Sequence, residues 1–189
     1  MSRMLLRGLV VAAFSLGVGA CAHDIGTPQT NIDTIQTLRK VDLAPMAVGS
    51  FVPGPKVSTG EDRSTTIRAI NEVTAPGGTF SGYLKTTFES ELRAAGRFDP
   101  NATLVLSGVL TDRSLDSAIG TGTASLAATI TLSKDGKTVF EKPYRVDAKW
   151  DSSFLGAIAI PDAINNFTGL FDKLATKVLT DPELAAAAR

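Results

Sequence analysis

The chain has 189 residues, 43% of them hydrophobic and 20% charged, with 19 basic side chains, 19 acidic side chains, one His and one Cys. This composition fits one globular domain, and the zero net charge excludes a strongly basic nucleic-acid-binding protein. One Cys and one His are too few for a zinc site within one chain, and a Ser-His-Asp triad would have to use His23. We therefore expect no metal, no cofactor and no catalytic residue, and hence a protein that is not an enzyme.

Residues 1–20 have the features of a signal peptide. Arg3 and Arg7 form a basic start, and residues 8–20 carry no charge. This uncharged run is shorter than the about 20 apolar residues that a membrane-spanning helix needs, and it suits the core of a signal peptide. The run ends in Val18-Gly19-Ala20-Cys21, which resembles the lipobox of bacterial lipoproteins. The alternative is an ordinary secretory peptide that leaves a free Cys.

The lipobox resemblance implies cleavage between Ala20 and Cys21 and attachment of lipid, including palmitate, to Cys21. Two or more acyl chains anchor a protein stably to a membrane. Ala22, rather than Asp, follows the Cys, and the similarity to Gram-negative lipoproteins then implies sorting to the outer membrane. The folded domain would face the periplasm, within the cell envelope.

We divide the remaining chain into three parts. Residues 21–36 are polar with little periodicity and are interpreted as a lipidated, flexible tether that contains His23. Residues 37–182 form a single α/β domain, and the Ala-rich residues 183–189 form a short C-terminal tail. The position of His23 in the tether argues against a catalytic or metal-binding role for it.

In the first half of the domain, residues 38–46 alternate as a strand that stops near Pro45, and residues 49–63 are rich in Gly and Pro and are predicted as a loop. Residues 64–73 are predicted as a strand. A helix begins after an N-cap at Thr79 and ends at Gly96. Its apolar side chains recur every four residues, at Phe80, Leu84, Phe88 and Leu92.

In the second half, residues 102–110 and 123–132 are predicted as strands, separated by a polar hairpin tip. Asp135-Gly136 predicts a tight turn into a third strand over 138–150, where Pro143 favours a sheet edge. The last helix is predicted to begin at Pro161 and to stop at Asp181-Pro182.

The predicted element order is β-β-α-β-β-β-α. Both predicted helices have one apolar face, and at least one face of the predicted sheet is polar. The fold class is therefore α+β, a two-layer sandwich with two helices packed on one face of a largely antiparallel sheet.

Several segments together resemble small periplasm-facing lipoproteins of the YajG type. They are V-x-L-A-P-M from Val41, the helix sequence F-S-G-Y-L-K-T-T-F-E-S-E-L from Phe80, and W-x-S-S-F-x-G from Trp150. The chain is more distantly similar to the LPS-assembly lipoprotein and to auxiliary lipoproteins of envelope ABC transporters. The resemblance implies an α/β sandwich over about residues 38–180, and it supplies no catalytic residue.

Two groups of side chains are candidates for chemistry. Asp112 and Asp116 form a carboxylate pair of the kind used in general acid–base catalysis, but turn geometry at a solvated hairpin tip explains them better. Ser152 and Ser153 have no histidine base within the predicted domain.

The connection over residues 150–160 is unusually apolar for a loop. It either folds under the sheet and completes the core, or presents a surface for a partner protein or a lipid. On the second interpretation the surface residues are Trp150, Phe154, Leu155 and Ile158.

The favoured function is a membrane-anchored periplasmic lipoprotein that acts as a non-catalytic accessory or scaffold for an envelope assembly or transport machine. Its partners would be the membrane, through Cys21, and an envelope protein. The alternative is a carrier of lipid or another small apolar ligand, which requires an enclosed pocket of about 300 Å³ or more. A carboxylate-dependent enzyme that uses Asp112 and Asp116 is the least favoured.

Overall fold

The computed structural model describes residues 22–41 and 43–189. Residues 1–21, with the predicted signal peptide, its cleavage site and Cys21, lie outside this part of the chain. Among the described residues, no helix has both the length and the hydrophobicity that a membrane crossing requires.

Two sheets form the strand layer. The larger has the order β2-β5-β6-β7, and its strands are Ala47–Pro53, Leu104–Ser117, Gly120–Lys134 and Lys137–Ser152. β2 runs parallel to β5, and the other two pairs are antiparallel. The smaller has the order β1-β4-β3, with strands Ala22–Asp24, Asn71–Thr74 and Ser64–Ile67.

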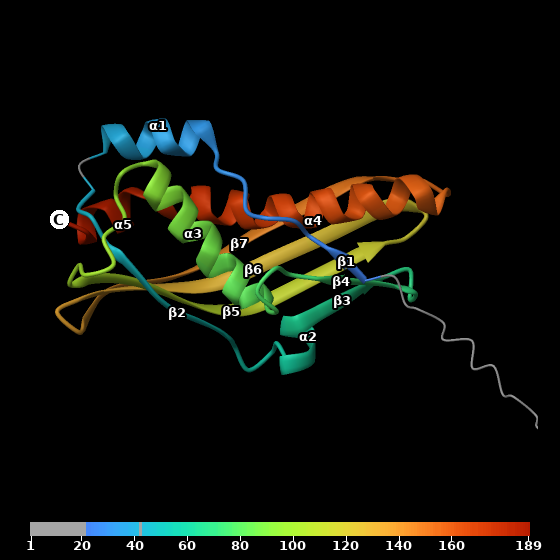
Figure 1. The fold of residues 1–189 in the computed structure, drawn as a ribbon, viewed down its shortest axis with the longest axis horizontal. Coiled ribbons are helices and arrows are strands. Elements are labelled where there is room, and N and C mark those ends of the chain that lie inside the picture. The colour runs from blue at the N-terminus through green and yellow to red at the C-terminus, as the bar shows by residue number, and fades with distance from the viewer. Residues whose placement is uncertain (1–21, 42) are drawn as a thin grey trace, which may run out of the picture.

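The helices α1, α3 and α4 lie on the same side of the larger sheet (Figure 1). The helices of the described chain are α1 Ile32–Lys40, α2 Thr59–Arg63, α3 Phe80–Ala94, α4 Gly156–Leu179 and α5 Pro182–Ala187. This arrangement confirms the predicted α+β class, with helices over one face of a largely antiparallel sheet.

Helix α3 forms as its sequence predicts. The Thr79 hydroxyl accepts a hydrogen bond from the Gly82 amide at 3.1 Å, and Gly96 after the helix has a φ of 72°. The predicted apolar stripe, Phe80, Leu84, Phe88 and Leu92, is fully buried. A second contact fixes the start of the helix, because the buried Asp62 carboxylate accepts from the Ser81 amide at 2.8 Å and the Ser81 hydroxyl at 2.7 Å.

Aromatic rings fill the space between α3 and α4. The Phe80 and Phe167 ring centroids are 5.4 Å apart, and those of Tyr83 and Phe171 are 4.9 Å apart, both in edge-to-face geometry. The four rings are buried. The two helices are therefore held to each other by a close-packed layer of aromatic rings.

The β5–β6–β7 meander is longer than predicted. The residues expected as a polar hairpin tip after position 110 are in strand conformation, and the connection between β5 and β6 is only Ala118–Ile119. An irregularity in register between Leu110 and Asp112 lets β5 continue. Asp135 and Gly136 have φ values of 51° and 78°, which confirms the predicted tight turn, and β7 is an edge strand as Pro143 indicates.

The order at the start of the domain was predicted wrongly. Residues 32–40 are the helix α1, and the edge strand β2 begins after Pro45, at Ala47, and continues to Pro53 within the region 49–63 that was predicted as a loop. Gly49 made this segment resemble a loop in the sequence. The structure requires glycine there, because a Cβ on Gly49 would lie 2.5 Å from the Ser107 hydroxyl oxygen of β5. The interpretation of residues 22–36 as a flexible tether is likewise wrong. The first three of these residues form β1, which pairs in parallel with β4 of the domain.

The end of the chain also differs from the prediction. Helix α4 begins at Gly156 and runs through Pro161, so half of the predicted apolar connection is helical. Pro161 removes the hydrogen bond to the Ala157 carbonyl, but both residues are exposed, so water can solvate that carbonyl. The predicted tail is α5, which buries Leu184 against the core.

The packing of the Trp150 ring against Gly122 on the neighbouring strand can be tested by substitution. A Cβ on Gly122 would collide with the Trp150 ring, so Gly122→Ala should lower the free energy of unfolding by about 1–3 kcal/mol. Gly169 is a matched control at an exposed position of α4 with no atom near its missing Cβ, so Gly169→Ala should raise stability by about 0.5–1 kcal/mol. Urea unfolding of both variants measures the difference, and equal effects would contradict the packing.

Candidate functional site

Exposed apolar residues gather at one end of the molecule. Phe154 is 74% exposed, and Leu155 and Ile158 are each at least half exposed. Two further residues, Ile70 at 76% and Ile119 at 66%, come from the β3–β4 and β5–β6 turns. We call these five residues the apolar end; the turns and the start of α4 lie together at one end of the ribbon (Figure 1).

The Arg68 side chain ties these segments to one another. Its guanidinium donates to the Ser117 carbonyl at 3.0 Å, to the Phe154 carbonyl at 3.1 Å and to the Ser153 carbonyl at 2.5 Å. A fourth donation reaches the Ser152 hydroxyl at 3.4 Å. Arg68 thus joins the turn that carries Ile70 to the segments that carry Ile119 and Phe154.

Of the predicted surface residues, Phe154, Leu155 and Ile158 lie together and Trp150 lies apart from them. Trp150 is partly buried against the hydrophobic core, with its ring over Gly122 of the neighbouring strand. The prediction missed Ile70 and Ile119. An isolated large apolar residue next to turn residues, as in Ala69-Ile70-Asn71 and Ala118-Ile119-Gly120, is the sequence signal for both.

The start of the described chain reaches the same end. Ala22 pairs with Glu72, two residues from Ile70, and His23 lies beside the first turns of α4. Between His23 and α4 is a shallow hollow of about 410 Å³, lined by His23, Gly156, Ala157, Ile160, Pro161, Ile164 and Asn165. The structure therefore places β1, and with it the chain that follows Cys21, at the apolar end.

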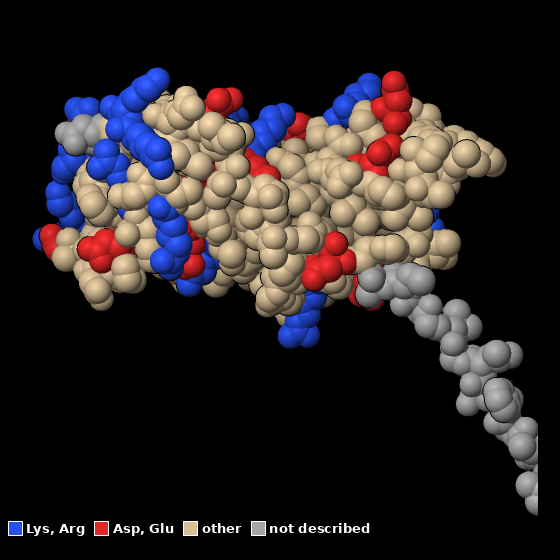
Figure 2. Space-filling view, turned by 45° about the horizontal axis from the view of Figure 1, so that its top comes forward, with Lys and Arg blue, Asp and Glu red and all other residues tan. Residues whose placement is uncertain are grey.

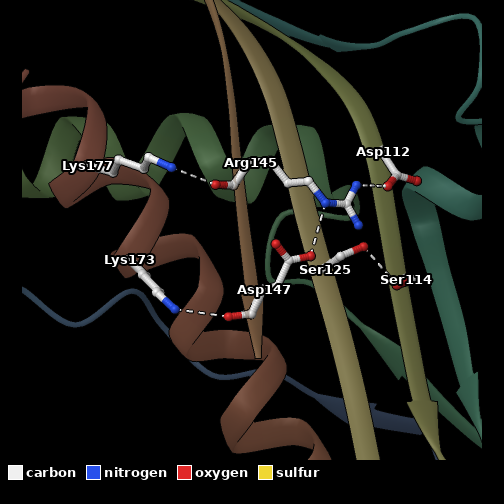
Figure 3. A network of polar contacts seen from close by, with 7 residues as sticks. All are labelled: Asp112, Ser114, Ser125, Arg145, Asp147, Lys173 and Lys177. Carbon is white, nitrogen blue, oxygen red and sulfur yellow. Dashed lines mark hydrogen bonds and ion pairs between the residues drawn. The ribbon is translucent and has the colours of Figure 1, made fainter. Parts of the chain in front are cut away.

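The two candidate carboxylates lie on the outer, helix-free face of the larger sheet. Asp112 forms an ion pair with Arg145 at 2.6 Å, and Asp147 contacts the same guanidinium at 3.0 Å (Figure 3). Asp116 is exposed four residues along the same strand, about 13 Å away at 3.3 Å per residue. That exceeds the about 6.5–9.5 Å between paired carboxylates in inverting glycosidases, so this pair does not form a shared acid–base site.

The two serines that are candidate nucleophiles have structural partners. The Ser152 hydroxyl is buried within 3.2 Å of the Ser117 hydroxyl, and the Ser153 hydroxyl accepts from the Leu155 amide at 3.1 Å. These contacts stabilise the connection between β7 and α4.

A groove of about 820 Å³ runs between α4 and the edge strand β7. Lys173 and Lys177 donate across it to the backbone carbonyls of Asp147 and Arg145, each at 2.9 Å (Figure 3). These carbonyls lie on the open side of the edge strand, so the lysines cover part of an edge that otherwise invites pairing with another strand.

Two acidic side chains lie at this groove or beside it, where α1, α3 and α4 meet: Glu91 is buried, and Asp172 is half-buried and lines the groove. The Glu91 carboxylate accepts from the Asn31 amide at 2.7 Å, while its other oxygen, the Tyr83 hydroxyl and one Asp172 oxygen find no hydrogen-bond partner among the described residues. Burial raises the pKa of Glu91, and burial raises the pKa of Asp172 to about 6. Burial and the nearby Asp172 also raise the pKa of Tyr83.

Comparisons with known proteins bear on the fold. No protein-family model and no curated protein matches the chain. A crystal structure of a DUF330 family protein from Xanthomonas campestris is similar with a TM-score of 0.59 and 10% identity, over 87% of this chain and 96% of that one. This likeness shows a shared fold.

Two further structures are less similar. A candidate lipoprotein from Caulobacter crescentus has a TM-score of 0.46 at 12% identity, over 82% of this chain and 94% of its own. A minor lipoprotein from Acinetobacter baumannii has a TM-score of 0.44 at 9% identity, over 77% and 93%.

The half-buried Asp172 predicts a particular pH dependence. The folded-state pKa is raised from 3.8 to about 6, so the folded protein binds more protons than the unfolded chain in this interval, and stability should fall as the pH rises through it. Removing the charge by Asp172→Asn should therefore stabilise the protein above about pH 7 by about 1 kcal/mol, after allowance for partial exposure, and by little below about pH 4.

Thermal and urea unfolding at the two pH values would measure this difference. Asp151→Asn, on the exposed side of β7, is the control and should show no such change with pH. A stabilisation by Asp172→Asn of the same size at both pH values would contradict a raised pKa of the half-buried Asp172 carboxyl group.

Proposed function

We propose that the protein is a lipoprotein of the outer membrane, anchored through acylated Cys21 with its domain in the periplasm, and that it serves as a non-catalytic accessory of an envelope assembly or transport machine. Two independent features together support a lipid anchor at Cys21. The lipobox-like Val18-Gly19-Ala20-Cys21 is followed at once by β1, and β1 lies at the apolar end of the domain.

The candidate side chains for catalysis support the non-catalytic role. Asp112 is engaged by Arg145, Asp116 lies well apart from it, and Ser152 is held by Ser117. His23 lies in β1 beside α4, and among the described residues its ring forms no hydrogen bond with any of these three side chains. These residues therefore form no nucleophile–base pair of the kind that acyl transfer needs.

Binding of a lipid or another apolar ligand is the second candidate, and the hollow beside His23 favours it. Of the residues that line this hollow, Ile160, Pro161 and Ile164 are apolar side chains of α4. The space between α3 and α4 holds no such hollow, because it is filled by the buried rings of Phe80, Tyr83, Phe167 and Phe171.

The anchor is tested by Cys21→Ser in the full-length protein. We expect the wild type to carry acyl groups by mass spectrometry and to float with membranes, and we expect the variant to lose both properties. A serine hydroxyl cannot form the thioether to which the lipid is attached, so a variant that stays acylated and membrane-bound would contradict the anchor. Val139→Ser, a substitution at an exposed strand position, is the control that should leave both unchanged.

Sorting is tested separately by Ala22→Asp. The resemblance to Gram-negative lipoproteins predicts that this variant is acylated but moves from the outer to the inner membrane fraction. Ala22→Ser is the matched control and should remain in the outer membrane. An Asp variant that is still recovered in the outer membrane would contradict the predicted sorting without affecting the anchor.

A further inference from the structure

We propose that the apolar end inserts into the surface of the bilayer, so that Ile70, Ile119, Phe154, Leu155 and Ile158 are immersed in lipid beside the anchor. This inference rests on the proposed acylation of Cys21 and adds a second, non-covalent membrane contact to it. We infer that the lipid bilayer, rather than another protein, covers this surface, because the chain that follows the acylated Cys21 enters the domain at the same end.

The chain enters the domain without a spacer. Consecutive Cα atoms are about 3.8 Å apart, so Cys21 lies one such step from Ala22, the first residue of β1. Ala22 is paired with Glu72 of β4, two residues from Ile70 at the turn. An acyl group on Cys21 would therefore hold this end of the domain, rather than a free tether, against the membrane.

Two of the three segments that form the apolar end are uncharged, and the third, the β3–β4 turn, carries Arg68 and is followed by Glu72. Residues 117–122 and 152–161 contain no Asp, Glu, Lys or Arg. In the space-filling view the tip of the molecule nearest the chain's entry is tan, whereas basic side chains crowd the opposite end (Figure 2). Five large apolar residues on neighbouring turns form a cluster, and clusters of this kind mark sites of contact with a membrane or a partner.

The surface is suited to hydrophobic insertion and not to attraction by anionic lipid. Arg68 is the basic residue at its centre, and its guanidinium donates to three carbonyls and a hydroxyl of the protein itself. The backbone acceptors of the turns are thereby paired within the protein, which reduces the cost of moving them out of water. Insertion should therefore occur into zwitterionic vesicles and should change little with salt.

The experiment uses the full-length, acylated protein in phosphatidylcholine vesicles. Cys21 is the only Cys of the sequence, so a Cys introduced elsewhere is the one free thiol once Cys21 is acylated. An environment-sensitive fluorophore is attached at Ile119→Cys or Phe154→Cys. Its emission and its quenching by lipids brominated in the acyl chains are then recorded at low and high salt.

Val139→Cys is the matched control. Val139 is another exposed apolar residue, and it lies on β7. It is near the Asp135–Gly136 turn, at the other end of the β6–β7 hairpin, about 45 Å from Ile119 and Phe154 at 3.3 Å per residue. We expect a blue shift and several-fold stronger quenching at positions 119 and 154 than at 139, with no loss in high salt.

The outcomes separate the two proposals. An unmodified Cys21 by mass spectrometry would overturn the anchor and, with it, the insertion. An acylated protein whose probes at 119 and 154 are as water-exposed as the probe at 139 would overturn the insertion alone. Shielding of 119 and 154 that requires added membrane protein would also overturn it, because the occupant would then be a partner protein.

Discussion

The hydrogen bonds of Arg68 join the segments that form the apolar end of the molecule. Arg68 lies in the β3–β4 turn of the small sheet, and its guanidinium reaches Ser117 at the end of β5 and Ser153 and Phe154 after β7 of the large sheet. A planar guanidinium offers five donors in a fixed fork, which suits several carbonyls converging from different segments. Arg113 on β5 also donates to the Ser64 carbonyl of β3, and the Ser117 and Ser152 hydroxyls are 3.2 Å apart, so Arg68 is one of several contacts that join these segments. With these contacts, the segments form one apolar surface in a fixed position beside β1.

The two ends of the domain differ in character, and this gives the proposed lipoprotein an orientation. Basic side chains crowd the end opposite the apolar one (Figure 2). At that end Lys142 pairs with Asp181 at 2.9 Å, and Lys134 donates to the Arg189 carbonyl at 2.9 Å. With the apolar end in lipid, the β5–β7 meander would project its charged end away from the membrane. The polar outer face around Arg145 would then be open for an envelope partner, and the lysines over β7 would limit non-specific strand pairing at that edge.

Sequence reasoning succeeded where periodicity was strong and local. The four-residue spacing from Phe80 to Leu92 defined α3, and the Asp135-Gly136 turn defined the β6–β7 hairpin. It failed where long-range contacts decide the conformation. Gly49 lowers the strand propensity of β2 and Gly54 directly follows the strand, yet at both positions the absence of a Cβ permits the close approach of the chain to β5. β1 has no pattern of its own, because a three-residue strand is defined by its partner β4.

The candidate site was partly predictable for the same reason. Phe154, Leu155 and Ile158 stood out because three large apolar residues are rare in a connection between elements. Trp150 belongs to the same apolar segment, but it lies on the last strand, where alternation directs every second residue inward, and Gly122 leaves room for its ring. Ile70 and Ile119 are each a single apolar residue in a turn, and single exposed apolar residues are common on any protein surface. Their significance arises only when Arg68 brings both turns to Phe154, a contact between residues 86 positions apart in the chain. The apolar end is therefore a property of the tertiary structure, and the proposed contact with the bilayer depends on the folded domain as well as on the lipid anchor.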